Sequence, residues 1–406
     1  MNINESLSIY HTELSAELES ILSFWSKRMI DGENDGFYGR IDGYNNLHPQ
    51  ADKGIVLNAR ILWTYSASYQ LTRNPDYLEK AHRAKDFILK YFQDKEFGGF
   101  FWVVDYQGRP VNTRKQIYAQ AFVLYAYVEY YKVNHDCGAL AIAKELYHLI
   151  EKHSLEINFG GYLEAFAHDW SSMDDVRLSS KETKDPKIMN THLHVLEAYT
   201  NLYRIDKSAE LEKSLRGLIN IFLQRIINRK THQFELFFDN EWNVRPHAIS
   251  FGHDIEGTWL LFEAAEVVGD KTLLKEVETE IMLMVNENIK WGLDTDGGLM
   301  NEAFENKVID SNKHWWPQAE AMVGYFNAFQ ISGNEVYLSK SIASWEFVKR
   351  SIIDKRNGEW YGLVSKDGTP ALMEDKAGLW KCPYHNGRAC IEIISRIESI
   401  IPQRFN

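Results

Sequence analysis

A short cassette rich in glycine and aromatic residues recurs six times along this chain and constrains its fold more than any other feature. Each copy separates long stretches with helical periodicity, and successive copies lie roughly 60 to 75 residues apart. Several copies run on into a turn, as at 105–108 and 366–368, which favours a short two-stranded hairpin. Such repetition predicts structural units stacked side by side. The six copies span 34–39, 97–102, 159–164, 233–238, 297–302 and 358–363.

Pairs of helical patterns occupy the stretches between the cassettes. In the first pair, 50–72 and 76–92, Pro75 separates the two helices because proline cannot continue a helix. Single helices are expected at 5–29 and 384–400, and these two can pair with each other and close the repeats into a ring. The other pairs are 115–132 with 138–153, 187–204 with 208–228, 253–268 with 271–289, and 316–331 with 335–352.

The two helices of a pair differ in hydrophobic pattern. Residues 55–65 are apolar on nearly every face, as in a helix buried on both sides, whereas 79–90 alternates charged and apolar positions. We therefore predict an all-α fold, an (α/α)6 barrel with six inner helices, six outer helices and short β-hairpins on one rim. The chain 1–406 is predicted to form a single catalytic domain, and an open array of helical repeats is the alternative.

The composition narrows the function. A formal net charge of -12 argues against nucleic-acid binding, for which a basic surface is expected. No apolar run reaches the ~18 residues of a membrane span, and the first residues are acidic and amphipathic rather than a secretory signal. Cys137, Cys382 and Cys390 form no disulfide framework, so we expect a cytoplasmic protein, and a monomer. Aromatic residues make up 13% of the chain and are typical of clefts that bind sugars.

Polar and aromatic residues recur near the starts of the predicted inner helices, in patterns that are otherwise apolar. Burying an unpaired charge costs several kcal/mol, so we expect these side chains to converge on a central cavity. The alternatives are a structural ion pair for the arginine of the first inner helix and a core position for the tryptophans. The candidates are Arg60, Tyr118, Phe122, Asn190, His194, His253, Glu256, Trp259, Trp315, Trp316, Glu320, Trp380, His385 and Arg388.

Among these candidates, His253 and Glu256 lie three residues apart and share one face of a helix. An imidazole beside a carboxylate has the basicity that a general base needs. The structural alternative is a histidine at a helix start, with Asp254 helping to cap the helix.

His192 and His194 are the candidate metal ligands in the sequence. These histidines point to different faces of a helix, and no third ligand follows at a characteristic spacing. We therefore predict no metal and no cofactor.

Five segments carry a resemblance to a known family. These segments occur in the same order as in the N-acylglucosamine 2-epimerase superfamily, which the sequence resembles. Within that superfamily it is most similar to the cellobiose 2-epimerases. Cys382 stands where that pattern usually has glycine. The segments are 56–63, 189–199, 252–256, 315–320 and 380–386.

The resemblance implies a cofactor-free enzyme that interconverts glucose and mannose configurations at C2 of a reducing-end sugar. It implies that His253 and His385 are the catalytic acid/base residues and that His194 assists ring opening. It assigns Arg60, Asn190 and Glu256 to substrate binding or histidine orientation, and Trp316 and Trp380 to stacking on the sugars. Tyr118, Phe122 and Glu320 match less specifically, and Trp259 and Trp315 complete the predicted substrate-binding set.

The chemistry agrees with this assignment. A C2 proton is acidic only after the sugar ring opens to an aldehyde, and its removal leaves an enediolate that needs hydrogen-bond donors. Inversion then requires reprotonation of the opposite face of C2, by a second base across the cavity or after rotation about C2–C3, and two histidines on different inner helices supply that geometry. The alternatives are an aldose-ketose isomerase acting on mannose, an N-acylglucosamine 2-epimerase, an (α/α)6 glycoside hydrolase using Glu256 and Glu320, and a non-catalytic sugar-binding protein.

Overall fold

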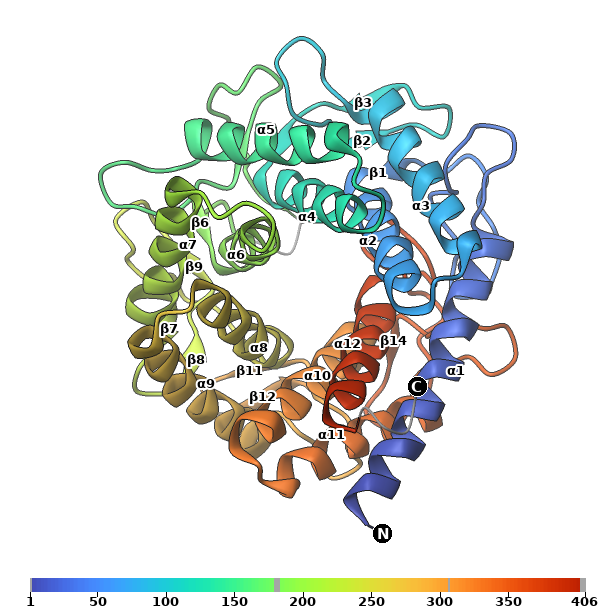
Figure 1. The fold of residues 1–406 in the computed structure, drawn as a ribbon, viewed down its shortest axis with the longest axis vertical. Coiled ribbons are helices and arrows are strands. Elements are labelled where there is room, and N and C mark those ends of the chain that lie inside the picture. The colour runs from blue at the N-terminus through green and yellow to red at the C-terminus, as the bar shows by residue number, and fades with distance from the viewer. Residues whose placement is uncertain (1, 179–182, 306, 402–406) are drawn as a thin grey trace.

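Two concentric rings of helices form the protein (Figure 1) in a computed structural model that describes residues 2–178, 183–305 and 307–401. Each inner helix contacts the next, and α12 contacts α2, so the ring is closed and the predicted (α/α)6 barrel is confirmed. The inner helices are α2 (Ile55–Thr72), α4 (Ile117–Asn134), α6 (Met189–Tyr203), α8 (Phe251–Val268), α10 (Trp315–Ser332) and α12 (Tyr384–Ile400).

Each outer helix packs on the inner helix of its own pair, and α7 and α9 also contact the next inner helix. As predicted, the first helix of the chain packs on the last, α1 on α12, while α3 packs on α2 and the remaining outer helices follow in order. Three of them end in a π-helical turn, at Ile88–Phe92, Phe222–Ile226 and Val348–Ile352. The outer helices are α1 (Ile3–Arg28), α3 (Pro75–Phe87), α5 (Cys137–His153), α7 (Ala209–Ile221), α9 (Lys271–Trp291) and α11 (Glu335–Phe347).

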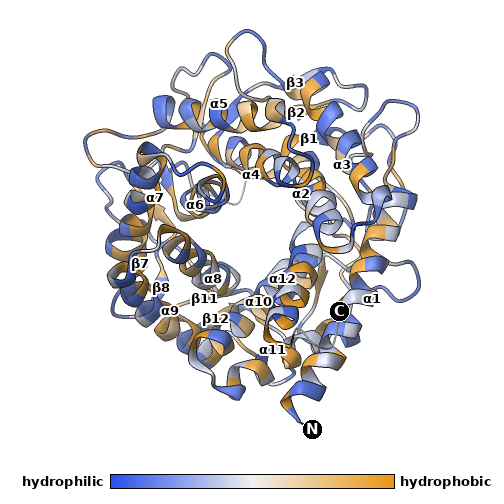
Figure 2. Cartoon of the chain, viewed as in Figure 1, coloured by the Kyte–Doolittle hydropathy of each residue, from blue (hydrophilic) through white to orange (hydrophobic). Residues whose placement is uncertain are grey.

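The core lies between the two rings. Every residue of α4 from Ile117 to Tyr130 is buried, whereas α7 buries only one stripe, which contains Leu211, Leu215 and Leu218. Figure 2 shows hydrophobic residues where the rings face each other and hydrophilic residues on the outer surface. No helix within the described ranges combines the length and apolar character that a membrane crossing requires.

Short antiparallel strand pairs lie at the N-terminal ends of the inner helices. The strands directly before an inner helix are β1 (Lys53–Gly54), β4 (Lys115–Gln116), β6 (Lys187–Ile188), β10 (Ile249–Ser250) and β13 (Lys313–His314). Their partners are β2 (Val103–Val104), β5 (Ala165–Phe166), β9 (Phe237–Phe238), β11 (Glu302–Phe304) and β14 (Leu363–Val364). A bridge between Ile41 and Ala377 completes the series beside α12.

The predicted hairpins are present on this rim. They include β2 with β3 (Pro110–Asn112), β11 with β12 (Lys307–Asp310), and β7 (Ile227–Asn228) with β8 (Gln233–Phe234). The predicted helix starts at 50, 115 and 187 are too early, because the residues just before α2, α4 and α6 are extended and pair with a neighbouring strand.

The fourth residue of several inner helices fastens the cassette that precedes it. Gln120 Oε1 accepts from the Phe100 amide at 2.9 Å, and Gln318 Oε1 accepts from the Leu299 amide at 2.7 Å. His192 Nε2 accepts from the Tyr162 amide at 2.9 Å in the same way. This bond and its full burial assign His192 to structural support, which agrees with the prediction that it is not a metal ligand.

Asp254 holds the same place in α8 and accepts from the Phe234 amide at 2.8 Å. It therefore caps a cassette rather than the start of its own helix. Burial raises the pKa of Asp254 to about 8. The native state then keeps a proton that the unfolded chain loses near pH 4, so this group lowers the free energy of unfolding progressively as the pH rises from about 4 to about 8.

Asp254→Asn keeps the acceptor oxygen and removes the titration. We expect the variant and the native protein to have similar urea midpoints at pH 4 and the variant to be more stable by several kcal/mol at pH 8.5. Parallel urea titrations at the two pH values measure this difference. If the difference in free energy of unfolding between the two proteins is the same at both pH values, Asp254 is ionised in the folded state.

A buried ion pair closes most of the loops that lead from an outer helix to the next inner helix. An acidic residue at the loop start binds the backbone of its own turn and also the ammonium of a lysine at the loop end; Asp31 and Lys53, for example, lie 2.7 Å apart and are both fully buried. In the loop before α8, Asn228 and Ile249 replace the two charged residues. The other pairs are Lys115–Asp94, Lys187–Glu156, Lys313–Asp294 and Lys376–Asp354.

Candidate active site

The predicted site residues lie at or near the N-terminal ends of the inner helices and contact one another across the ring. Most are fully buried, but five are partly exposed to solvent and so mark the accessible side of the cluster. These five are Asn190, His253, Trp315, Trp316 and Trp380.

Two histidines from different inner helices contact one tryptophan. The ring centroid of Trp316 lies 4.7 Å from that of His253 and 5.8 Å from that of His385. The ring of Trp315 also contacts His385, and the centroids of these two rings lie 6.5 Å apart. The structure therefore places the two predicted acid/base residues around a shared aromatic wall.

Arg60 forms a second group with aromatic residues. Among the described residues, no carboxylate lies within ion-pair distance of its guanidinium. The guanidinium donates to the Tyr118 hydroxyl at 2.8 Å and to the Trp380 carbonyl at 3.2 Å, and it lies 4.3 Å from the Phe122 ring centroid. The rings of Tyr118 and Phe122 also contact His194, with centroids 4.9 and 4.7 Å away. The predicted alternative of an ion pair for Arg60 is wrong, and its charge faces the predicted site.

Arg388 is the centre of a buried charge cluster beneath these groups. Its Nη2 donates to Glu256 Oε1 and to Glu320 Oε1, both at 2.7 Å. Its Nη1 bonds Glu197 and the Tyr384 hydroxyl. A single guanidinium thus contacts three carboxylates from α6, α8 and α10.

The histidines differ in what holds their Nδ1 atoms. His194 Nδ1 bonds Glu197 Oε2 at 2.8 Å, and His385 Nδ1 bonds Glu320 Oε1 at 2.7 Å. His253 Nδ1 instead bonds the Ser250 hydroxyl at 2.8 Å. The predicted pairing of His253 with Glu256 is therefore wrong, because Glu256 turns to Arg388.

Burial keeps all three imidazoles neutral. It lowers the pKa of His253 to about 3, and it lowers the pKa of His194 even though the Glu197 carboxylate opposes the change. Burial together with the charges of Arg60 and Arg388 holds the pKa of His385 well below its usual range. Neutral imidazole is the form that accepts a proton, so each ring is ready to act as a base.

The three carboxylates differ in charge. Burial opposes ionisation of Glu197, but Arg388 and His194 outweigh it and lower its pKa to about 2. Burial and the nearby Glu320 raise the pKa of Glu256 to about 8. Burial raises the pKa of Glu320 as well, against the effects of Arg388 and Trp259. Glu320 accepts hydrogen bonds from three partners, whereas Arg388 is the one donor to Glu256 among the described residues, so Glu256 is the more readily protonated of the two carboxyl groups.

Three supporting residues stand outside the predicted set. Glu197 follows His194 by three positions, so the helical spacing that was applied to His253 would have found it. Ser250 and Tyr384 carry no comparable signal in the sequence. Trp259, predicted to bind substrate, is 1% exposed and donates to Glu320 Oε2 at 3.0 Å, a position behind the carboxylate.

Within the described part of the chain, one group of side chains has the spacing of a metal site. Its ligand atoms, from Glu256, Glu320 and His385, lie within 4.8 Å of one another. The Arg388 guanidinium already bonds both carboxylates, and a cation there competes with a metal for the same oxygens. The arrangement suits an internal ion cluster.

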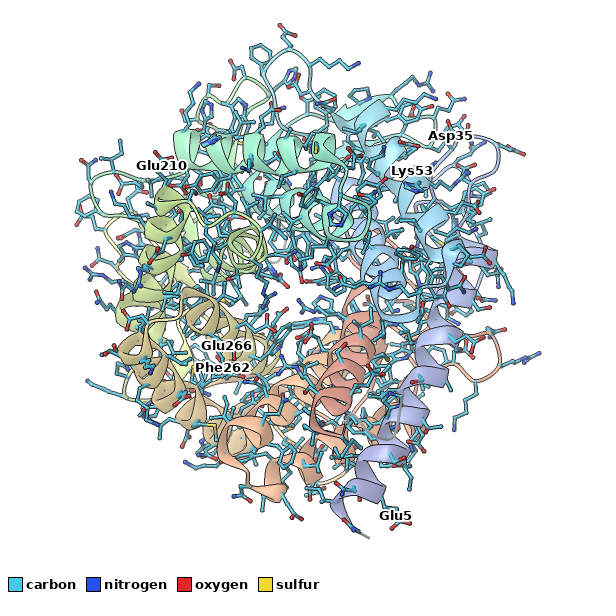
Figure 3. All side chains as sticks on the ribbon, viewed as in Figure 1. Glu5, Asp35, Lys53, Glu210, Phe262 and Glu266 are labelled. Carbon is cyan, nitrogen blue, oxygen red and sulfur yellow. The ribbon has the colours of Figure 1, made fainter. Side chains whose placement is uncertain are left out.

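A cavity of about 520 Å³ lies elsewhere, at the C-terminal ends of α8, α10 and α12. Its lining includes Phe262 and Glu266, which Figure 3 labels, together with Glu263, Glu392 and Arg396. This lining holds no histidine, so it lacks the acid/base groups of the candidate site.

Comparisons with known proteins agree with the geometry. The sequence profile of the family described as N-acylglucosamine 2-epimerase (GlcNAc 2-epimerase) matches residues 36–389. A cellobiose 2-epimerase from Bacteroides fragilis is 47% identical over 388 residues, which cover 95% of this chain and 99% of that protein. A cellobiose 2-epimerase from Ruminococcus albus is 41% identical and is covered to 98%, with 95% of this chain.

Solved structures have the same architecture. The structure of cellobiose 2-epimerase from Bacillus thermoamylovorans B4167 superposes with a TM-score of 0.92 at 39% sequence identity. The match covers 96% of this chain and all of that one, so the twelve-helix ring is shared from end to end.

Proposed function

The chain belongs to the N-acylglucosamine 2-epimerase family and is an isomerase of the epimerase type, and from this premise we propose its substrate and mechanism. The proposed reaction interconverts the glucose and mannose configurations at C2 of the reducing-end residue of β-1,4-linked disaccharides, cellobiose to glucosyl-mannose. The high identity to proteins named cellobiose 2-epimerase supports this substrate class.

The observation that carries the mechanism is the placement of His253 and His385 around Trp316. Both imidazoles are neutral through burial, and they come from α8 and α12. Inverting C2 requires removal of a proton from one face and its return to the other. One histidine takes the C2 proton and later releases it to solvent, and the other returns to the opposite face a proton that it has taken from solvent, so a hydride cofactor is unnecessary.

Ring opening comes first. A base takes the O1 proton while an acid gives a proton to O5, and the ring becomes an aldehyde whose C2 proton is acidic. His194, held by Glu197, is the proposed base or acid for this step. The Oδ1 atom of Asn190 is buried without a hydrogen-bond partner within the described residues, and it is the proposed acceptor for a sugar hydroxyl.

Removal of the C2 proton then leaves negative charge on an enediolate. Arg60 donates to Tyr118, whose ring contacts His194, and no carboxylate of the described residues pairs with it, so it is the proposed donor to this charge. Trp380 contacts Tyr118, with ring centroids 6.0 Å apart, and is the proposed stacking surface for the second sugar.

The carboxylates do not favour hydrolysis. A glycosidase places two carboxyl groups about 5 to 9.5 Å apart across an open bond-cleaving site. Glu256 and Glu320 are each 1% exposed and share one guanidinium nitrogen of Arg388. Their position supports the histidines rather than an approach to a glycosidic bond.

Proton NMR in D2O tests the proposal directly. The protein is treated with EDTA and mixed with cellobiose and, separately, with mannose. The expected product of cellobiose is the disaccharide with mannose at its reducing end, carrying deuterium at C2. Fructose formed from mannose, with cellobiose barely changed, would assign an aldose-ketose isomerase instead. Free glucose from cellobiose would assign a hydrolase, and activity lost with EDTA and restored by a metal would overturn the metal-free mechanism.

A further inference from the structure

Arg388 connects two of the three histidines without touching either. Its guanidinium is buried, contacts Glu197, Glu256 and Glu320, and lies 4.7 Å from the Trp259 ring centroid. Two of those carboxylates continue to a ring: Glu197 to His194 and Glu320 to His385. The chain of contacts therefore branches from one arginine to both imidazoles.

We propose that Arg388 is a positioning residue that fixes the tautomers of His194 and His385 together, by holding Glu197 and Glu320 as the anions that accept their Nδ1 protons. Both rings then direct an unprotonated Nε2 toward the substrate. The inference rests on the proposed epimerase function, because it assigns these Nε2 atoms to proton transfer.

The tautomer of each ring depends on whether the carboxyl group bonded to its Nδ1 is ionised or protonated. A carboxylate behind an imidazole accepts the Nδ1 proton and leaves Nε2 free to accept another. A carboxylic acid in the same place donates to Nδ1, and the ring proton moves to Nε2, where it blocks the base. Buried carboxyl groups take up a proton unless a positive charge is near. Arg388 supplies that charge to both carboxylates at once.

The third carboxyl group completes the balance. One guanidinium cannot neutralise three carboxylates, and Glu256 accepts from Arg388 without a second described donor. Burial raises the pKa of both Glu256 and Glu320, but Glu320 accepts hydrogen bonds from three partners that stabilise its anion, so Glu256 retains the proton of the cluster. This leaves Glu197 and Glu320 as the two anions.

His253 provides an internal control for the proposal. Its Nδ1 bonds the Ser250 hydroxyl in place of a carboxylate, although the charge of Glu320 acts on the pKa of the ring. Removing the Arg388 charge should therefore change the tautomers of His194 and His385 and leave that of His253 as it is.

The experiment uses the full-length protein with 15N-labelled histidine and no substrate. Arg388→Met removes the charge at similar length, and Arg388→Lys keeps it but cannot bond three carboxylates. Glu197→Gln and Glu320→Gln each remove one branch. The Nδ1 and Nε2 shifts are assigned by comparison with single histidine variants, and circular dichroism confirms folding.

We expect Arg388→Met to move both His194 and His385 toward the Nε2-protonated tautomer, and each glutamine variant to move only its own histidine. We expect kcat to fall roughly 10²- to 10⁴-fold with a much smaller change in KM. If Arg388→Met does not fold, Arg388→Lys and the two glutamine variants make the same comparison.

Unchanged tautomers in the folded Arg388→Met variant, or equal shifts at His253, would overturn the proposal. Where Arg388→Met does not fold, unchanged tautomers in both glutamine variants would do so. The resting-state spectra do not depend on the reaction. An inactive native protein with the expected tautomer changes would therefore contradict the epimerase function and leave the positioning role in place. An active native protein with unchanged tautomers would do the opposite.

Discussion

Replacing His385 or His253 with asparagine is expected to lower kcat/KM for epimerisation by about 10³-fold or more, because each variant removes a group that transfers the C2 proton. Asparagine retains a polar side chain at a buried position, so folding should be preserved. Binding of the disaccharide, measured by calorimetry, should change little, because Arg60, Trp316 and Trp380 remain in place. Deuterium exchange at C2 followed by NMR gives the rate.

His192 offers a matched control for these variants. It is a fully buried histidine near the start of an inner helix, but its Nε2 accepts a hydrogen bond from the Tyr162 amide. Gln120 and Gln318 do the same work in two other repeats, so His192→Gln is expected to keep near-normal turnover. Normal turnover in either His253→Asn or His385→Asn would mean that the acid/base assignment is wrong.

Breaking the ion pair between Lys53 and Asp31 is expected to have the largest effect on stability. Lys53→Ile leaves the Asp31 carboxylate buried without its cation, and removing one partner of a buried pair costs about 3 to 5 kcal/mol. Asp31 retains the amides of Glu33 and Asn34, which moderate the loss without replacing the charge. Urea denaturation measures the shift in midpoint.

The loop before α8 shows how the damage can be repaired. Asn228 and Ile249 occupy the corresponding positions there without any charge, and Asn228 Oδ1 still accepts from the Lys230 amide. The double variant Lys53→Ile with Asp31→Asn is therefore expected to recover most of the lost stability. A double variant as unstable as the sum of the single variants would show that the ion pair itself is not the source of the loss.

Much of the fold follows from local sequence signals. Pro75 and the six cassettes mark where helices stop, and the apolar residues from Ile55 onward identify an inner helix before any contact is known. The starts of α2, α4 and α6 were misplaced because two-residue strands owe their structure to a partner roughly 50 residues along the chain, an interaction without local periodicity. The lysines that precede these helices are a repeat signal of their own.

The site was harder to predict in detail than in outline. The predicted residues do converge, because the N-terminal ends of all inner helices meet on one side of the ring. Which carboxylate serves which histidine depends on side-chain direction across helices, and helical spacing alone predicted His253 with Glu256 where the structure pairs His194 with Glu197. The catalytic roles stay predictions that the variants above test.

The closure of the ring by its last inner helix has a consequence for synthesis on the ribosome. Until α12 emerges, α2 and α10 have no neighbour on one side, and the nascent chain exposes an apolar seam between its oldest and youngest segments. Arg60 contacts Trp380, which lies 320 positions away in the sequence, and contacts between such distant residues form slowly. His385 and Arg388 belong to this same helix. A translation product that ends before α12 therefore lacks both the helix that closes the ring and these two residues of the proposed site, and we expect it to be inactive.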